Sequence, residues 1–398
     1  MIARVLGLAA ALGAAACARG PVDPDTVDPT RAAARDPLGQ PVMALRWQHA
    51  TADRLNEVTP QEFAAPAVDR DTAYIGTATG HFLALRLSDG HVRWEINARG
   101  VSAQALVAWP NIYVGTNDGE LMCLTADRGR ECLNPEKPGT KAWPYQSHGP
   151  IGQPPVAVAG MVAFANEADT VTAVDARTGA FKWQYKSETP EEYTLRGHAG
   201  LAVDGDLIFT GFANGTLVAL RAQTGSVAWL TSLKGDADRF FDVDATPIVV
   251  GSTVFATSSS GGVYALDKAT GLVRWRVALF EGANGQAPGN VGGLVSDGER
   301  LYVAAADQGI YCLDLDGNIL WRQGTRGGGE PAAPLVTGDF LMYALADGGL
   351  FVADKRSGDV LQYFDPGDGV SAQPAITGDD RVIVLSNRGI AYGLDLDR

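Results

Sequence analysis

One motif recurs along this chain and constrains its fold more than any other feature. It consists of Gly, four mostly apolar residues, an Asp-containing turn, Thr-Gly or Ser-Gly, three further residues and Trp. In residues 262–275 the motif reads as a β-hairpin, because an apolar strand runs into an Asp-to-Gly turn and a return strand ends in Trp. Complete or degenerate copies begin at residues 80, 119, 169, 215, 262, 309, 349 and 389.

Two further apolar runs precede each hairpin, such as residues 246–251 and 254–257 ahead of the copy at 262. The repeating unit is therefore four short strands in 39 to 50 residues, which is typical of a propeller blade. A helical solenoid would need long runs of period 3.6, and a β-sandwich would need eight coincidental in-phase copies. The sequence thus predicts an all-β fold, an eight-bladed β-propeller with four-stranded antiparallel blades.

The two ends of the repeat array complement each other. Residues 43–50 (MALRWQHA) read as an outer strand without a hairpin, and the last copy stops at Arg398 before its own outer strand. We expect residues 43–50 to supply the fourth strand of the blade built from residues 370–397. Such closure removes exposed sheet edges and makes residues 43–398 one domain.

The first 42 residues look like targeting sequence. Residues 1–16 combine Arg4 with a short apolar run and Ala14-Ala15-Ala16, which predicts a signal peptide. Cys17 follows at once, as in a bacterial lipobox, so we expect it to be acylated; plain secretion is the alternative. Residues 17–42 then form a flexible tether, and neither interpretation leaves a membrane-spanning helix in the mature protein.

Net charge and cysteine content bear on two questions: whether the protein binds nucleic acid, and whether it contains a disulfide. The net charge of −14, from 46 acidic and 32 basic residues, makes nucleic acid an unfavourable partner. Cys123 and Cys132 could form a disulfide in an oxidising compartment, although the simplest hairpin register places them on opposite faces. Cys312 occupies the position equivalent to Cys123 and is expected to be a small buried residue.

The motifs of common catalytic sites are missing from the sequence. Its five histidines do not stand at metal-ligand spacing, and it has neither a nucleophile elbow nor a phosphate-binding loop. The Asp-rich stretches 314–317 and 365–369 read as turns. We therefore predict no enzymatic activity, no catalytic or metal-ligating residues and no cofactor, and expect function in the long connections 189–197 and 234–244.

The motif Ala-x-Asp-x-x-Thr-Gly-x-x-x-Trp, clear at residues 173–183, resembles the repeat of quinoprotein-type propellers. One family with this repeat, the pyrroloquinoline-quinone alcohol dehydrogenases, is longer and binds its quinone with adjacent cysteines and calcium; this chain has no Cys-Cys pair. The other is the BamB family of outer-membrane lipoproteins, which resembles residues 43–398 and has no cofactor. The resemblance is sharpest in residues 193–197 (YTLRG) and 238–247.

Resemblance to the BamB family implies a non-enzymatic scaffold in outer-membrane β-barrel assembly, lipid-anchored and facing the periplasm. Its partner would be a BamA-like barrel protein, bound through a POTRA domain by one copy of this chain within a larger complex. The implied partner-binding residues are Tyr193, Leu195, Arg196, Arg239, Asp242 and Asp244. The alternative for the two aspartates is that they brace their loop by pairing with Arg196 or Arg239. The alternatives are a periplasmic quinoprotein-like oxidoreductase and a generic propeller that binds protein or glycan.

Overall fold

The computed structural model describes residues 41–51, 61–137, 139–140, 143–188, 199–234, 242–259, 262–279, 291–306, 308–325 and 329–397. The predicted signal peptide, Cys17 and nearly all of the tether lie outside these residues. Within them, no helix has the length and apolar character needed to cross a membrane.

Thirty-two strands build eight sheets, numbered here as blades in the order of their first strands. The first blade contains β2 (Ala67–Asp69), β3 (Thr72–Gly76), β4 (His81–Arg86) and β5 (Val92–Asn97), and the second contains β6 (Leu106–Ala108), β7 (Asn111–Gly115), β8 (Glu120–Thr125) and β9 (Tyr145–Gln146). The third blade contains β10 (Val156–Val158), β11 (Met161–Asn166), β12 (Thr170–Asp175) and β13 (Phe181–Lys186), and the fourth contains β14 (Ala202–Asp204), β15 (Leu207–Gly211), β16 (Thr216–Arg221) and β17 (Val227–Ser232).

The fifth blade contains β18 (Ile248–Val250), β19 (Thr253–Ser258), β20 (Gly262–Asp267) and β21 (Val273–Ala278), and the sixth contains β22 (Val291–Ser296), β23 (Arg300–Ala305), β24 (Gly309–Asp314) and β25 (Ile319–Gln323). The seventh blade contains β26 (Leu335–Thr337), β27 (Phe340–Ala344), β28 (Leu350–Asp354) and β29 (Val360–Phe364). The eighth contains β30 (Ala375–Ile376), β31 (Arg381–Ser386) and β32 (Ile390–Leu396) together with β1 (Met43–Ala50).

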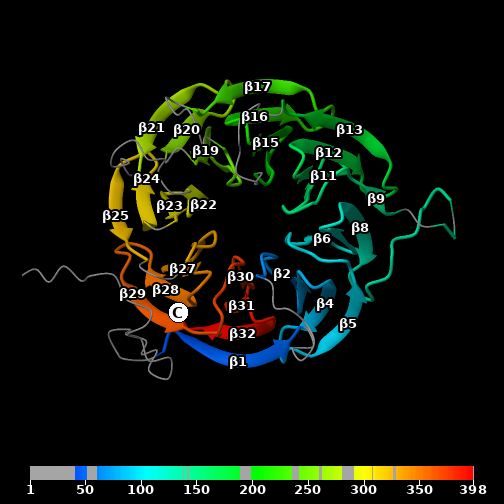
Figure 1. The fold of residues 1–398 in the computed structure, drawn as a ribbon, viewed down its shortest axis with the longest axis horizontal. Coiled ribbons are helices and arrows are strands. Elements are labelled where there is room, and N and C mark those ends of the chain that lie inside the picture. Colours follow the sequence, from blue (N-terminus) through cyan, green and yellow to red (C-terminus); the bar gives the residue numbers. More distant parts are fainter. Residues whose placement is uncertain are drawn as a thin grey trace, which may run out of the picture.

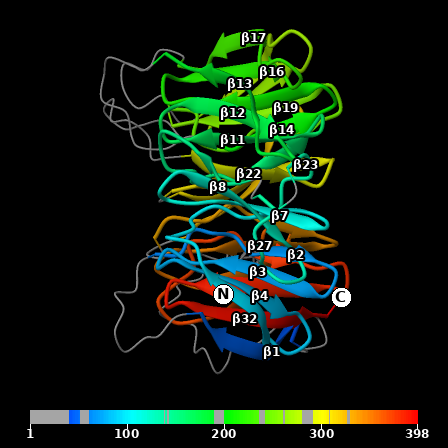
Figure 2. The same ribbon diagram turned by 90° about the vertical axis from the view of Figure 1, so that its right-hand side faces the viewer.

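The blades form a closed ring around a central opening (Figure 1). Each sheet is antiparallel, and its strands run across the thickness of the disc (Figure 2). The eighth sheet has the order β1-β32-β31-β30, and β1 pairs along β32 from Met43↔Leu396 to Ala50↔Ile390. The predicted eight-bladed propeller, closed by an N-terminal strand, is therefore confirmed.

Burial explains the two kinds of apolar pattern in each unit. The middle strands of a blade are covered on both faces by neighbouring blades, so β11 (MVAFAN) is buried at every position. The outermost strand has one face toward solvent, so β13 (FKWQYK) has buried or partly buried residues at alternate positions. Continuous apolar runs and alternating runs thus mark the inside and the rim of the same ring.

The antiparallel order divides the loops between two faces of the disc. What we call the turn face carries the turns from first to second and from third to fourth strand. The crossover face carries the turns from second to third strand and the connections between blades. The long connections that the sequence singled out therefore belong to the crossover face.

The tryptophan of the motif makes a contact with the next blade, which we call the clasp. Trp183, at the rim of the third blade, is buried, and its indole N–H donates to the Ala222 carbonyl of the fourth blade at 2.8 Å. Its ring lies against Gly225, whose φ is +69°. A Cβ atom added at Gly225 would come within 2.4 Å of the Trp183 ring. The same clasp joins Trp47 to Leu87, Trp94 to Ala126, Trp229 to Lys268, Trp275 to Leu315 and Trp321 to Lys355.

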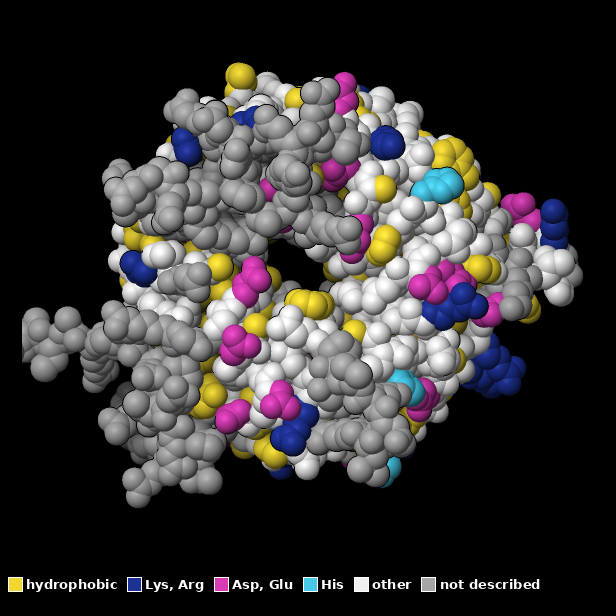
Figure 3. Space-filling model, in the orientation of Figure 1, with side chains coloured by type: hydrophobic (Ala, Val, Ile, Leu, Met, Phe, Trp, Pro, Cys, Tyr) yellow, Lys and Arg dark blue, Asp and Glu magenta, His cyan; other side chains and the backbone are white. Residues whose placement is uncertain are grey.

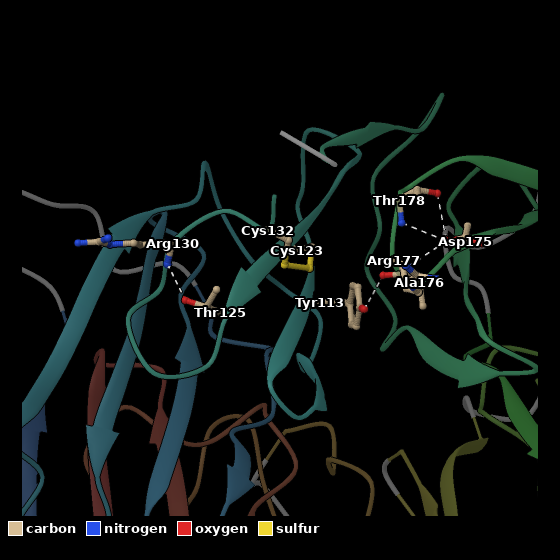
Figure 4. Close-up of a disulfide and its surroundings, with 9 residues drawn as sticks. All are labelled: Tyr113, Cys123, Thr125, Arg130, Cys132, Asp175, Ala176, Arg177 and Thr178. Carbon is tan, nitrogen blue, oxygen red and sulfur yellow. Dashed lines mark hydrogen bonds between the residues drawn. A yellow bond between two sulfur atoms is a disulfide. The ribbon is translucent and has the colours of Figure 1, made fainter. Parts of the chain in front are cut away.

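Two junctions use a donor other than an indole N–H. At the second blade the Tyr113 hydroxyl donates to the Ala176 carbonyl of the third blade at 2.7 Å (Figure 4). At the seventh blade the Gln362 amide exchanges two hydrogen bonds with the backbone of Met43, at 2.8 and 2.9 Å, and so holds the start of β1. Each junction thus keeps a side chain that reaches the backbone of the next blade.

Cys123 and Cys132 form a disulfide, with Cα atoms 5.4 Å apart (Figure 4). The register that placed them on opposite faces is wrong. In the third blade a β-bulge sets Ala173 opposite Trp183, whereas in the second blade Cys132 donates its N–H to the Cys123 carbonyl at 2.9 Å without that extra residue. Cys132 therefore lies directly opposite Cys123, and Trp143, which precedes Tyr145 by two residues as Trp183 precedes Tyr185, packs against Tyr113 with ring centres 5.5 Å apart. Cys312 is buried and unpaired, as expected.

The clasp predicts that two glycines with similar backbone conformation differ in their tolerance of a side chain. Gly225→Ala should lower the free energy of unfolding by about 2–5 kcal/mol, because backbone strain adds to overpacking against Trp183. Gly205→Ala is the control, since Gly205 also has positive φ but no atom lies within 4 Å of its added Cβ, so it should cost only about 1–2 kcal/mol. Urea denaturation measures both, and equal losses would refute the clasp.

The disulfide should stabilise the second blade through chain entropy. With 9 residues of sequence separation, Cys123→Ala/Cys132→Ala should cost roughly 2–3 kcal/mol. Dithiothreitol should shift the urea midpoint of the wild type toward that of the double variant and leave the variant itself unchanged. An unchanged wild-type midpoint, with thiol titration proving reduction, would contradict this prediction.

Candidate functional site

A cavity of about 610 Å³ occupies the centre of the ring. Its walls come from the segments that lead into the first strands, and the space-filling view shows the opening (Figure 3). Two lining amides also join blades: Gln104 donates to the Pro66 carbonyl at 2.8 Å, and Gln373 donates to the Pro334 carbonyl at 2.6 Å. The lining thus mixes polar and apolar residues, and part of its hydrogen-bonding capacity already holds the inner ends of the blades together.

A group of acids lies on the crossover face where the third, fourth and fifth blades meet. Asp169 comes from the turn between β11 and β12, and Asp242 and Asp244 come from the segment ahead of β18. Backbone bonds fix this segment: Ser259 donates to the Asp242 carbonyl at 2.8 Å, and Val243 donates to the Phe212 carbonyl at 3.2 Å. It is thus tied to turns of both the fourth and fifth blades.

Burial and mutual repulsion shift the titration of these acids. Burial, together with the neighbouring charges of Asp242 and Asp169, raises the pKa of Asp244 to about 7. Burial also raises the pKa of Asp169, again with a contribution from Asp242. Like charges in a poorly hydrated place disfavour full ionisation, so the group tends to retain a proton near neutral pH.

The predicted partner-binding residues divide into two sets. Tyr193, Leu195, Arg196 and Arg239 lie outside the described residues. Asp242 and Asp244 are described, and Asp242 is only 1% exposed. In this conformation its carboxylate faces the protein interior, a position suited to bracing the connection.

Sequence reasoning missed two buried acids on this face. Asp169 stands where other copies of the motif have Gly, and its φ of 52° shows that it adopts the left-handed conformation of that glycine. That replacement was a usable signal. Glu62 gave none: it accepts a hydrogen bond from Ala78 N–H at 2.7 Å, donates its own N–H to Asn387, and has its pKa raised by burial to about 7.

The central cavity does not suit the quinone of the dehydrogenase alternative. Pyrroloquinoline quinone carries three carboxylates, which require cationic partners. The described residues that line the cavity include Glu167 and neutral amides such as Asn117 and Gln153, but neither Lys nor Arg. Among the described residues, no group of three or more His, Cys, Asp or Glu side chains could hold a metal ion. The described lining therefore offers no cation to balance the three carboxylates of the quinone.

The architecture places the protein in the class of eight-bladed propellers with quinoprotein-type repeats. Within that class its sequence matches the family described as outer membrane protein assembly factor BamB, over residues 44–136, 98–290 and 260–398. These matches run through the whole propeller, and the chain belongs to this family.

Individual relatives are distant. The outer membrane protein assembly factor BamB of Nitrosomonas eutropha is 23% identical over 154 residues, which cover 38% of this chain and 35% of that protein. The crystal structure of BamB from Moraxella catarrhalis matches with a TM-score of 0.73 at 19% identity, covering 89% of this chain and 99% of that one. A quinohemoprotein alcohol dehydrogenase of Pseudomonas putida HK5 matches with a TM-score of 0.67 at 16% identity, covering 89% and 76%. These structural likenesses show the shared fold.

The acid group predicts a pH-dependent stability. Because the pKa of Asp244 is about 7 in the folded protein and near 4 when unfolded, the native state binds the extra proton between these values, and its stability falls as pH rises. Asp244→Asn removes this loss. Its stability relative to wild type should therefore increase by on the order of 2 kcal/mol from pH 4.5 to pH 8.

Urea midpoints across this pH range measure the effect. Asp206→Asn is the control, because the Asp206 side chain is 79% exposed, and it should track the wild type. If the difference between Asp244→Asn and wild type stays constant with pH, Asp244 does not titrate as described.

Proposed function

We propose that this protein is a non-enzymatic scaffold lipoprotein of the machinery that assembles and inserts outer-membrane β-barrel proteins. In this proposal an acylated Cys17 anchors the chain in the outer membrane, and the propeller faces the periplasm. The partner is the POTRA region of a BamA-like barrel protein. The observation that carries the proposal is the family match, which extends from residue 44 to residue 398.

The geometry of the crossover face supports a mechanism of presentation on a rigid base. The proposed contact segments, residues 189–197 and 234–244, join the third to the fourth and the fourth to the fifth blade. Asp242 and Val243, near the end of the second segment, are bound to the turns of the neighbouring blades. We infer that the buried aspartates fix one end of the contact loop, while Tyr193, Leu195, Arg196 and Arg239 meet the partner.

A scaffold of this kind needs a rigid ring more than a reactive site. Hydrogen bonds join neighbouring blades both at the rim of the ring, through the clasps, and at its centre, through the glutamine amides. Binding energy then need not be spent on ordering the scaffold itself. This suits a protein that positions a partner, and the absence of Lys and Arg among the described residues that line the central cavity argues against the oxidoreductase alternative.

The proposal predicts that Arg196→Ala weakens partner binding without unfolding the propeller. We expect at least a tenfold loss of affinity, because an interfacial Arg often contributes about 2 kcal/mol or more. The tagged full-length protein is isolated from detergent-solubilised membranes, and bound chains are identified by mass spectrometry. Arg356→Ala is the matched control, since Arg356 lies on the turn face with its side chain 70% exposed.

Each outcome of this experiment has a defined meaning. Recovery of a POTRA-bearing barrel protein with wild type and Arg356→Ala, but not with Arg196→Ala, supports both function and site. Recovery with all three keeps the function and moves the site away from Arg196. Failure to recover such a protein even with wild type contradicts the scaffold function and favours the quinoprotein-like or glycan-binding alternatives.

A further inference from the structure

A second cavity lies on the turn face, away from the proposed partner loops. It measures about 310 Å³ and is formed where the first and second blades meet. Its walls come from the turn between β2 and β3, the turn between β6 and β7, the turn after β8, and the start of β5. Neither the scaffold function nor the blade clasps require a hollow at this place.

The cavity contains an aromatic residue that the fold does not explain. The eight turns between first and second strands all lie in the described part of the chain, and Trp109 is the one aromatic residue among them. It is 48% exposed, and the Arg70 guanidinium lies 3.9 Å from the centre of its ring. The contact with Arg70 joins the first and second blades, and the part of the indole left in water provides a flat apolar surface for a ligand.

The polar groups around Trp109 are of both signs. Arg93 pairs with Asp71, and Arg70 Nε lies 3.7 Å from Asp69 Oδ2. Asp127 adds a third carboxylate to the wall. Three acids and two bases nearly cancel, so the cavity favours a neutral ligand over a strongly charged one.

One acceptor in the wall is left without a hydrogen-bond donor. Asp69 Oδ2 is buried, and it accepts no hydrogen bond from any residue that the structure describes. Buried carboxylate oxygens normally have such a donor. The Asp69 side chain as a whole remains 30% exposed, and rotation about its Cβ–Cγ bond would bring either oxygen to the cavity.

These features together match the chemistry of a sugar. A pyranose ring has an apolar C–H face that packs on an indole, because its hydrogens meet the negative face of the ring. Its hydroxyls both donate, as Asp69 requires, and accept, as the two arginines require. We propose that this cavity binds a neutral saccharide, with Trp109 as the stacking surface and Asp69, Arg70 and Arg93 as hydrogen-bonding partners.

The test uses the full-length protein and four neutral probes: cellotetraose, maltotetraose, fully N-acetylated chitotetraose and N-acetyl-D-glucosamine. Saturation-transfer NMR detects contact, and calorimetric titration gives affinity and stoichiometry. We expect at least one probe to bind at a single site. Trp109→Ala should weaken that binding at least tenfold, whereas Trp109→Phe, which keeps an aromatic surface, should weaken it less.

Phe181→Ala is the matched control, because Phe181 is an aromatic residue of β13 with 55% exposure and should not affect binding. Thermal unfolding midpoints establish that the exposed positions can be changed without loss of fold. Binding of a probe that depends on Trp109 but not on Phe181 supports the proposal. It is overturned if all four probes fail to bind, or if binding is equal in wild type and Trp109→Ala.

A peptide, acetyl-Gly-Arg-Gly-amide, serves as the competing probe. If this peptide binds in a Trp109-dependent manner and the sugars do not, the proposal is overturned and the cavity is assigned to basic protein segments. Trp109→Ala should leave recovery of the POTRA-bearing partner unchanged. Failure of the saccharide site is therefore distinguishable from failure of the scaffold function.

Discussion

The indole of Trp183 lies on Gly225 of the next blade and donates to a carbonyl there, and the ring depends on this contact repeated around its rim. A single blade has middle strands that are apolar on both faces, as in β11, so it cannot bury them alone. Neighbouring blades must cover those faces. The clasp fixes their distance and angle at the rim, where the sheets diverge most, and so turns eight marginal sheets into one domain.

The junctions without an indole donor show which part of the contact is essential. Tyr113 replaces the indole N–H with a hydroxyl and reaches the equivalent carbonyl, Ala176. The disulfide of its blade adds a covalent link within the blade rather than between blades. Gln362 makes a two-bond exchange with Met43 at the point where chain closure must be secured. What all the junctions share is a side-chain hydrogen bond to the backbone of the next blade, and the indole is its commonest form.

The fold could be predicted from the sequence because the motif of one blade recurs eight times along the chain. The Gly-to-Trp spacing encodes both the hairpin turn and the junction, so even the closure by residues 43–50 was visible. The disulfide was not predictable with confidence, because its register depends on the loss of one bulge residue, which strand patterns do not reveal. The acid group was only partly visible. Asp242 and Asp244 stood out through family resemblance and Asp169 through a missing glycine, but their shared burial arises from three blades meeting.

The same ring puts different demands on its two faces. On the crossover face the protein buries acids that repel each other and raise the pKa of Asp244, a cost that simple turns would avoid. Such unfavourable placements persist where position matters more than stability, which agrees with a loop held for a partner. On the turn face the departure is of another kind: an exposed indole in the turn between β6 and β7, beside a buried carboxylate oxygen without a hydrogen bond at the end of β2. The seven other turns between first and second strands fold without an aromatic residue, so the fold does not require Trp109, and a ligand accounts for it.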